Sequence, residues 1–328
     1  MHTQTSTAPT TSMQVDGIAD GVDVGDAGPQ ATPQETRLEL LKVSGRGYTV
    51  VRHLFTQLPS DESARASVLG PMVTDRKRRS IQLYLMLLTA WPYVANLAEK
   101  GQPPLASEVW ARALRTQKGR QWTNTHVSAA WTDLEQRGLI DRKRLARGVV
   151  VRPRREDGNA DYTKPGQKAN DRRETYFVLP QEFWTEEWFE RLTLPGLAML
   201  LVISAGTSDK AEIWLTNAKV QDWYGISPRS AEAGIEDLKA HGLLTERVEW
   251  IKAPLSAIGA TQRHWYSLAG AFGTDQRRKV QKAAQVQLET RRGKSASGDV
   301  ADPEVRRVLV KKTGKKQKKR PSGEVAGK

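Results

Sequence analysis

The chain has 328 residues and a formal net charge of +14, with 38% hydrophobic residues and no cysteine. Its length predicts two domains with additional tails, and the absence of cysteine excludes disulfides, thiolate zinc sites and a cysteine nucleophile. The longest apolar run, residues 194–205, has about 12 residues, whereas a membrane span needs about 20. The N-terminus lacks the basic start and apolar block of a signal peptide. We therefore expect a cytoplasmic, nucleoid-associated protein that contacts no membrane and whose first candidate partner is nucleic acid.

The positive charge is confined to two parts of the chain. Residues 71–155 and residues 271–328 each carry a net charge of +11, and residues 35–70 carry +1. Residues 1–34 carry −4 and residues 156–270 carry −5. The change of sign near residue 155 indicates a change of role along the chain.

Composition predicts disordered ends around a folded centre. Residues 1–35 form an acidic segment almost without large apolar side chains, which we expect to be disordered. Residues 36–74 are expected to be a helical lead-in, with residues 48–58 as a helix that packs on the first domain or its twin. Residues 273–328 are expected to be a basic, largely disordered tail with a short polar helix over 276–292. The polybasic run 311–320 is either an arm that contacts DNA or a solubilising tail.

The centre of the chain contains one pattern twice, with an offset of 104 residues. Apolar residues at positions i, i+4 and i+7 predict one buried face of a helix in each copy; they are Val127, Trp131 and Leu134, then Ala231, Ile235 and Leu238. Thr123 and Ser227 stand where N-caps are expected, and Pro228 suits the first helical position. Gly138 follows the first of these helices and Gly242 follows the second. Both positions predict helix ends, because glycine adopts the left-handed cap conformation at little cost.

Each copy has further predicted elements on both sides. Upstream lie a helix with an apolar face over 81–91 that ends at Pro92, its counterpart over 194–205, and shorter helices over 107–115 and 216–223. Downstream, residues 139–144 and 148–152 pair through a turn at Arg147 and Gly148, and residues 243–251 pair with 264–268. A further strand over 175–179 is expected after a 22-residue polar stretch, and residues 173–178 match 263–268. The sequence thus predicts an α+β fold with a basic domain over 75–180 and an acidic domain over 181–272.

The order helix, helix–turn–helix, β-hairpin resembles the winged helix-turn-helix superfamily of DNA-binding proteins. The resemblance is carried by residues 223–230 (WYGISPRS) with 235–244 and by residues 127–140, and it covers roughly residues 75–270. One wing alone is similar to GntR-type or MarR-type regulators, and two tandem copies are similar to iteron-binding plasmid replication initiators. The resemblance implies that the third helix of a copy enters the major groove.

The first copy carries the residues expected to read and grip DNA. Its third helix, residues 123–137, is expected to present polar side chains to base edges, namely Asn124, Thr125, His126, Ser128 and Thr132. The alternative is that these residues are simply solvated. The hairpin over 142–155 is expected to be a wing that lies on phosphates, through Arg142, Lys143, Arg144, Arg147, Arg152, Arg154 and Arg155. Further phosphate contacts, which position the protein without specifying sequence, are expected from Arg76, Arg78, Lys118 and Arg120.

The second copy has the opposite charge and a different expected role. In this copy only Lys219 and Arg229 are placed like DNA contacts. If it bound DNA, its carboxylates would lie near the phosphates, and the repulsion between these like charges would oppose binding. We therefore expect residues 181–272 to pack against the first domain, to form a homodimer or to bind a protein partner. Phe183, Trp184, Trp188 and Phe189, between the copies, are expected in the core.

The sequence gives little indication of enzymatic chemistry. Gly293-Lys294-Ser295 lacks the first glycine of a phosphate-binding loop, and the five histidines are scattered singly. We expect no catalytic residues, no metal and no cofactor. The leading prediction is a transcriptional regulator that binds double-stranded DNA. The alternatives are a replication initiator of a plasmid or other mobile element, and a DNA-bound adaptor protein.

Overall fold

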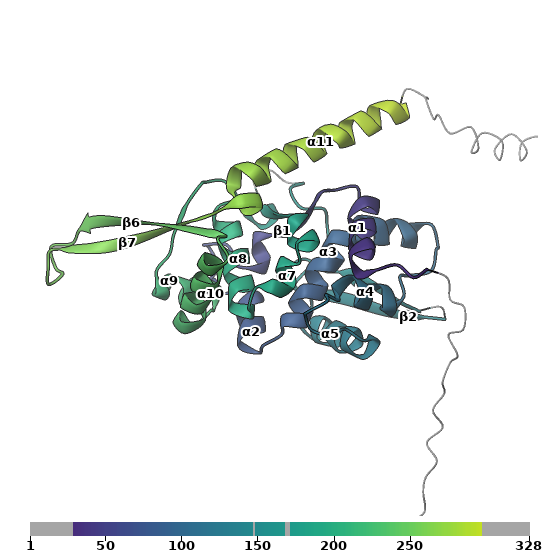
Figure 1. Ribbon diagram of the computed structural model, residues 1–328, viewed down its shortest axis with the longest axis horizontal. Coiled ribbons are helices and arrows are strands. Elements are labelled where there is room, and N and C mark those ends of the chain that lie inside the picture. Colours follow the sequence, from purple (N-terminus) through teal and green to yellow (C-terminus); the bar gives the residue numbers. More distant parts are fainter. Residues whose placement is uncertain (1–28, 147, 168–170, 297–328) are drawn as a thin grey trace, which may run out of the picture.

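The computed structural model describes residues 29–146, 148–167 and 171–296 (Figure 1). Over these residues it is a mixed α/β protein with eleven α-helices and three small antiparallel sheets. The tails expected to be disordered, and the polybasic run 311–320, lie largely outside the described residues. Inside them, α1 (Pro33–Val43) already begins within the expected acidic tail, and α11 (Thr274–Ala296) confirms the polar helix expected over 276–292.

The first unit consists of α3 (Arg78–Glu99), α4 (Ser107–Leu114) and α5 (Asn124–Gln136), followed by the hairpin of β2 (Ile140–Leu145) and β3 (Gly148–Pro153). The prediction that the first helix ends at Pro92 is wrong, since α3 continues to Glu99. Proline removes one backbone donor and crowds the carbonyl four residues earlier. Leu88 before it and Val94 and Leu97 after it are buried, so core packing on both sides outweighs this local cost.

The second unit repeats the order and adds a strand. It contains α8 (Leu194–Gly206), β5 (Ile213–Trp214), α9 (Asn217–Tyr224), α10 (Pro228–Ala240), β6 (Leu244–Lys252) and β7 (Ala260–Leu268). The three strands form one sheet in the order β5-β7-β6. The β6–β7 hairpin projects from the body at one end of the molecule (Figure 1).

The third helices of the two units, α5 and α10, begin and end as the sequence predicts. The Thr123 hydroxyl accepts from the backbone N–H of His126, and the Ser227 hydroxyl accepts from that of Ser230. Gly138 and Gly242 adopt left-handed φ values of 69° and 68°. Each helix ends in two backbone hydrogen bonds of 2.9 Å that define a Schellman motif; they run from Gly138 and Leu139 to Glu135 and Leu134, and from Gly242 and Leu243 to Lys239 and Leu238.

The expected helix over 48–58 is wrong. Tyr48–Arg52 is strand β1, which is followed by a 3-10 turn over His53–Phe55. The segment Tyr-Thr-Val-Val-Arg is rich in aromatic and β-branched residues, which favour a pleated surface. β1 pairs with β4 (Tyr176–Pro180), across more than 100 residues of sequence. The sequence match between residues 173–178 and 263–268 does not extend to strand pairing. β7 pairs with β5 and β6, whereas β4 pairs with β1.

The β1–β4 pair joins the two units into one core. β1 contacts α3 of the first unit, and β4 contacts α8 of the second. The short helices α6 (Glu182–Thr185) and α7 (Trp188–Arg191) carry Phe183, Trp184, Trp188 and Phe189, all of which are buried as expected. α2 (Leu69–Thr74) packs on α8, and α1 packs on α4. The relative position of the two units is therefore set by shared packing.

One helix of the described chain, α3, is long and apolar enough to cross a membrane by length and composition. It is the central helix of the first unit, and Ile81, Leu85 and Leu88 on it lie inside the core. A buried core helix passes the same test, so this finding carries little weight for a membrane.

Candidate nucleic-acid interface

The outer face of α5 is exposed and polar. Asn124, Thr125, Ser128 and Thr132 are exposed, whereas His126 is half-buried. The opposite face is fixed in the core by the apolar residues of the same helix, among which Trp131 packs edge-on against Trp110 of α4 with ring centroids 5.6 Å apart. The 3.6-residue period thus holds one set of side chains inside and leaves the other in solvent.

Three of the five predicted base-reading side chains already have hydrogen-bond partners. The Asn124 amide donates to the Glu108 carboxylate of α4, and the Thr132 hydroxyl donates to the Ser128 carbonyl at 3.0 Å. The His126 ring accepts from the backbone N–H of Thr123 at 3.3 Å, which completes the helix cap. The side chains of Thr125 and Ser128 make no hydrogen bond within the described chain.

The β2–β3 hairpin turns one face toward α5. Arg142 lies opposite Val151, and Arg144 lies opposite Val149, so both arginines share the face on which Val151 is buried. The Arg142 guanidinium donates to the Glu135 carboxylate at the end of α5, with an Nε–O distance of 2.9 Å. The structure therefore brings the cationic hairpin and the outer face of α5 together.

The remaining hairpin cations fall into two groups. Arg154 pairs with Asp141 at 3.3 Å and Arg155 pairs with Asp157 at 2.7 Å, and the hydrogen bond to Asp157 raises the pKa of Arg155. Lys143, Arg144 and Arg152 have no ion-pair partner among the described residues. Arg147 lies outside the described residues. The hairpin's ion-pair partners all belong to the first unit, so the acidic second unit does not neutralise the wing within the described chain.

Arg78 corrects the predicted set of phosphate contacts. Its side chain is buried and donates to the backbone carbonyls of Phe189 and Glu190, at 3.2 and 2.6 Å. Burial lowers the pKa of this guanidinium. Its buried head joins α3 to α7, which does not fit the expected contact of a solvent-facing arginine with a DNA phosphate.

The other predicted phosphate contacts are exposed. Arg76 is exposed in a left-handed conformation, with φ 56°. Arg120 is exposed and pairs with Glu190 at 3.3 Å. Lys118 is exposed and has no ion-pair partner in the described part of the chain.

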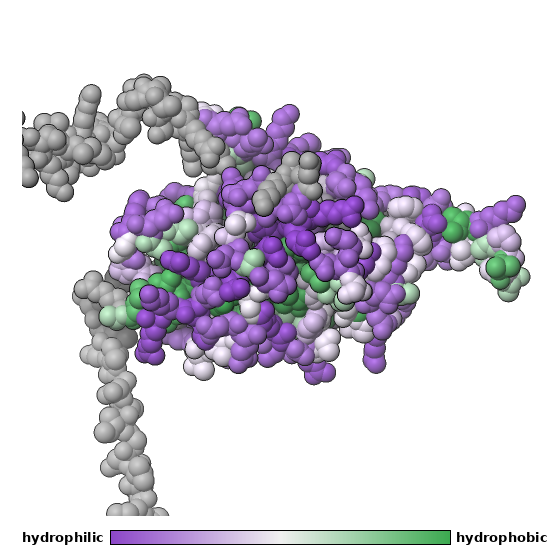
Figure 2. Space-filling view, turned by 180° about the vertical axis from the view of Figure 1, so that it is seen from behind, coloured by the Kyte–Doolittle hydropathy of each residue, from purple (hydrophilic) through white to green (hydrophobic). Residues whose placement is uncertain are grey.

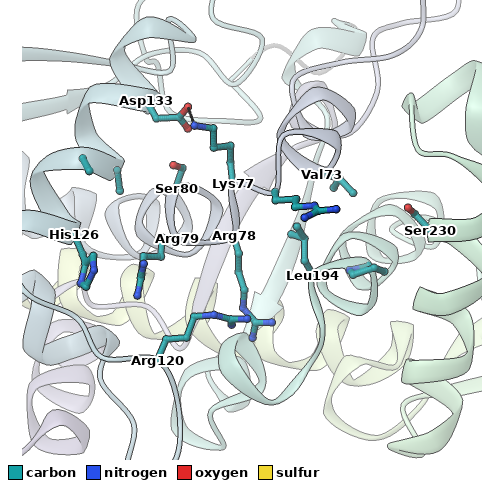
Figure 3. A pocket seen from close by; sticks show the side chains of 14 residues that line it. Val73, Lys77, Arg78, Arg79, Ser80, Arg120, His126, Asp133, Leu194 and Ser230 are labelled. Carbon is teal, nitrogen blue, oxygen red and sulfur yellow. Dashed lines mark ion pairs between the residues drawn. The ribbon is translucent and has the colours of Figure 1, made fainter.

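A pocket of about 580 Å³ lies between the two units (Figure 3). Sequence reasoning missed it, because it forms only where elements far apart in the chain meet. Its walls come from the turn before α3, the start of α3, α5 and the starts of α8 and α10, and its lining includes Arg76, Lys77, Arg79, Arg120, His126 and Ser230. In the sequence the tetrabasic segment 76–79 pointed to this place, and Arg120 and His126, also expected to contact DNA, line the same pocket.

Positive charge dominates the pocket. Asp133 is the one carboxylate of its lining, and it pairs with Lys77 at 3.1 Å. Burial alone would raise the pKa of Asp133, but hydrogen bonds from Ser80 and Lys77 and the charge of Arg137 hold it below its usual value. Asp133 is thus ionised and engaged with cations, which leaves Arg76 and Arg79 without a carboxylate partner among the described residues.

The second unit contains the two cations that the sequence places like DNA contacts, Lys219 and Arg229. Arg229 is exposed in the first turn of α10. Lys219 lies over the Trp214 ring, with its Nζ 3.1 Å from the ring centroid, and burial lowers its pKa. Within the described ranges no three His, Asp or Glu side chains gather in a way that would hold a metal ion.

The arrangement can hold an extended polyanion along the first unit and across the pocket. Polar side chains suited to hydrogen-bond base edges lie beside cations suited to phosphates. No protein-family model, curated protein or solved structure matches this chain, so its function has to be inferred from this geometry.

Proposed function

We propose that the chain is a double-stranded DNA-binding protein built from two tandem winged-helix domains, residues 75–180 and 181–272. In support, each unit has three helices followed by a β-hairpin, and α5 and α10 share the same N-cap and Schellman ending. In such a domain the third helix enters the major groove. Here that helix is α5, whose exposed polar residues would meet base edges.

The observation that carries this proposal is the contact between the hairpin and α5. Because Arg142 reaches Glu135, the cationic hairpin is held beside the exposed face of the helix. Lys143, Arg144 and Arg152 are not engaged with carboxylates of the described chain, so they are available for phosphates. A cationic side chain that contacts a DNA phosphate displaces a counterion from the DNA. The release of these counterions favours binding of the protein to the DNA.

The salt dependence of DNA binding tests the proposal. If about six phosphates are neutralised, affinity for a duplex falls by roughly 10³ between 50 and 200 mM salt. The double change Lys143→Ala and Arg144→Ala should weaken binding and reduce the slope of log affinity against log salt by about one for each lost contact. Fluorescence anisotropy with a labelled duplex measures both quantities.

A charge-matched control distinguishes a specific surface from overall charge. Arg278 and Lys282 lie exposed on α11, which lies on the other side of the body from α5 (Figure 1). The double change Arg278→Ala and Lys282→Ala removes the same charge and should leave the slope as it is. A flat salt response of the wild type, or equal losses in the two variants, would contradict DNA binding through the hairpin.

Transcriptional regulation is the leading biological role. A replication initiator, which would use both units on repeated sites, is the second candidate, and one observation favours it: α5 and α10 line the same pocket, through His126 and Ser230. Genome-wide footprinting separates the two roles. A single palindromic operator supports the regulator, whereas repeated sites beside the protein's own gene on an episome support the initiator.

The second unit also has a surface suited to a protein partner, which supports the adaptor role. Exposed apolar side chains lie along the distal half and tip of the β6–β7 hairpin, namely Val248, Trp250, Leu255 and Ile258. Figure 2 shows green residues at the tip of the projecting arm and at one point along it. Exposed apolar patches commonly mark interaction sites. A protein captured with the chain after nuclease treatment, and lost with Trp250→Glu, would support this role.

A further inference from the structure

We propose that the pocket between the two units is a phosphate-binding site. The ligand class is a phosphate group, either a phosphodiester of the DNA backbone or a free phosphorylated small molecule. For the first source the inference rests on the proposed function, because DNA then supplies the phosphate. For the second source it is independent of that function.

The start of α3 is open toward the pocket. This 22-residue helix begins at Arg78 after Lys77, and no side chain of the described chain caps its N-terminus. Arg78, Arg79 and Ser80, its first three residues, all line the pocket. The first backbone N–H groups of a helix lack partners within it, and together with the helix dipole they favour an anion.

Three other helices begin at the same pocket. His126 is the third residue of α5, Leu194 and Pro195 start α8, and Ser230 is the third residue of α10. Those helices are each 13 residues long, so their dipoles are well developed. Their own N-caps are satisfied by Thr123, Thr193 and Ser227, and thus they add a positive field while α3 supplies free donors.

The guanidinium groups of the pocket are incompletely hydrogen-bonded within the described chain, although the unpartnered Nε atoms of Arg78 and Arg79 are themselves buried within the protein. Arg78 is 7% exposed, and its Nε is buried without a hydrogen-bond partner among the described residues. The Nε of Arg79 is in the same situation, although its Nη2 donates to the Gln121 carbonyl at 3.2 Å. Arg120 lies beside Arg78, and the two share the Glu190 carboxylate (Figure 3). One carboxylate shared between the buried Arg78 and the exposed Arg120 leaves a net positive charge for a ligand to offset.

Size and composition fit a phosphate with part of its carrier. A volume of about 580 Å³ lies in the range of small-ligand pockets, about 300–1,000 Å³. The lining combines the cations with apolar side chains, among them Val73, Leu194 and Pro195. Because the lining comes from both units, a ligand in the pocket would lie between α5 and α10, whose His126 and Ser230 line its opposite sides (Figure 3).

Two binding measurements on the full chain test this site. The probes are inorganic pyrophosphate, followed by calorimetry, and a labelled DNA duplex, followed by anisotropy. The pocket variant is Arg76→Ala with Arg120→Ala, which spares the buried Arg78, and the charge-matched control is again Arg278→Ala with Lys282→Ala. Loss of two charge-assisted hydrogen bonds should weaken binding by about tenfold or more, and circular dichroism shows whether each variant is folded.

Each outcome either identifies the source of the phosphate, a free molecule or the DNA backbone, or rejects the site. Pyrophosphate binding that is weakened in the pocket variant and unchanged in Lys143→Ala with Arg144→Ala supports a free phosphate ligand. Duplex binding weakened in the pocket variant beyond the control, without pyrophosphate binding, supports a backbone phosphate. If neither probe distinguishes the pocket variant from the control, the site is rejected. Failure of the proposed function has a different signature, an unchanged duplex affinity in the hairpin variant.

Discussion

His53 shows how a single side chain couples the fold to pH. It follows strand β1, stacks on Phe177 with ring centroids 6.0 Å apart, and has a buried Nε2 without a hydrogen-bond partner in the described chain. Burial lowers the pKa of His53 to about 4. The folded protein therefore holds this imidazole neutral at pH values where an unfolded chain would protonate it.

We expect acid to destabilise the protein through His53. The unfolded state takes up a proton near pH 6.5, whereas the folded state resists it until about pH 4. The contribution of the neutral His53 to the free energy of unfolding is therefore fully present above pH 6.5. It is lost as the pH falls toward 4, by up to roughly 3 kcal/mol. Urea unfolding across this window measures it. His53→Gln should flatten that part of the profile, and an unchanged profile in the variant would contradict the assignment.

Arg52 shows what sequence reasoning missed at the residue scale. Its guanidinium is fully buried and pairs with Glu156 at 2.9 Å and with Glu174 at 3.1 Å. The two glutamates belong to the polar stretch between β3 and β4. Buried ions persist only when they are paired, so the loop is fixed to β1 by this network. No local pattern reveals a pairing between residues more than 100 positions apart.

At the scale of elements, the ends of α5 and α10 were predictable, whereas the expected end of α3 at Pro92 was wrong. α5 and α10 have the N-caps and terminal glycines that their sequences predict, because capping depends on residues within one or two turns. The hairpins were also found, with boundaries within a few residues of those observed. Strand β1 was not predicted, because a five-residue strand becomes stable only when it pairs with its partner β4.

The two terminal glycines form a matched pair for a stability test. Gly242 has open space where a Cβ would stand, whereas a Cβ on Gly138 would lie 3.0 Å from the Gly158 carbonyl oxygen. Gly242→Ala should cost about 1–2 kcal/mol, the strain of a left-handed conformation for alanine. Gly138→Ala should cost more, because the close contact adds to the same strain. Denaturant unfolding of both variants checks the order, and equal or reversed costs would contradict it.

At the scale of the whole molecule, two units share one core but differ in charge. The first unit carries the cationic hairpin and most of the basic pocket, whereas the second unit, residues 181–272, carries a net charge of −4. β1 and β4 join α3 to α8, so the units are held as one body. This arrangement supports a division in which the first unit binds DNA and the second organises partners.

Single substitutions in α5 and α10, the third helices of the two units, test that division. Arg229→Ala, on α10, should leave duplex affinity nearly unchanged if the second unit makes few DNA contacts. Ser128→Ala, on α5, removes an exposed hydroxyl without a hydrogen bond in the described chain, and it should lower affinity for the specific site while sparing nonspecific binding. Anisotropy with specific and random duplexes measures both. A loss in Arg229→Ala as large as that in Lys143→Ala would instead favour two DNA-reading units.

The sequence by itself determined the local elements: the helices from their apolar period, their ends from capping residues, and the repeated order from the 104-residue offset. These features depend on interactions among near neighbours in the chain. Only the tertiary structure decided that Arg78 is buried, that β1 pairs with β4, and that residues 76–79 face the starts of four helices across one pocket. Such contacts join segments up to about 150 residues apart, and their geometry follows from how the core packs, which no local pattern encodes.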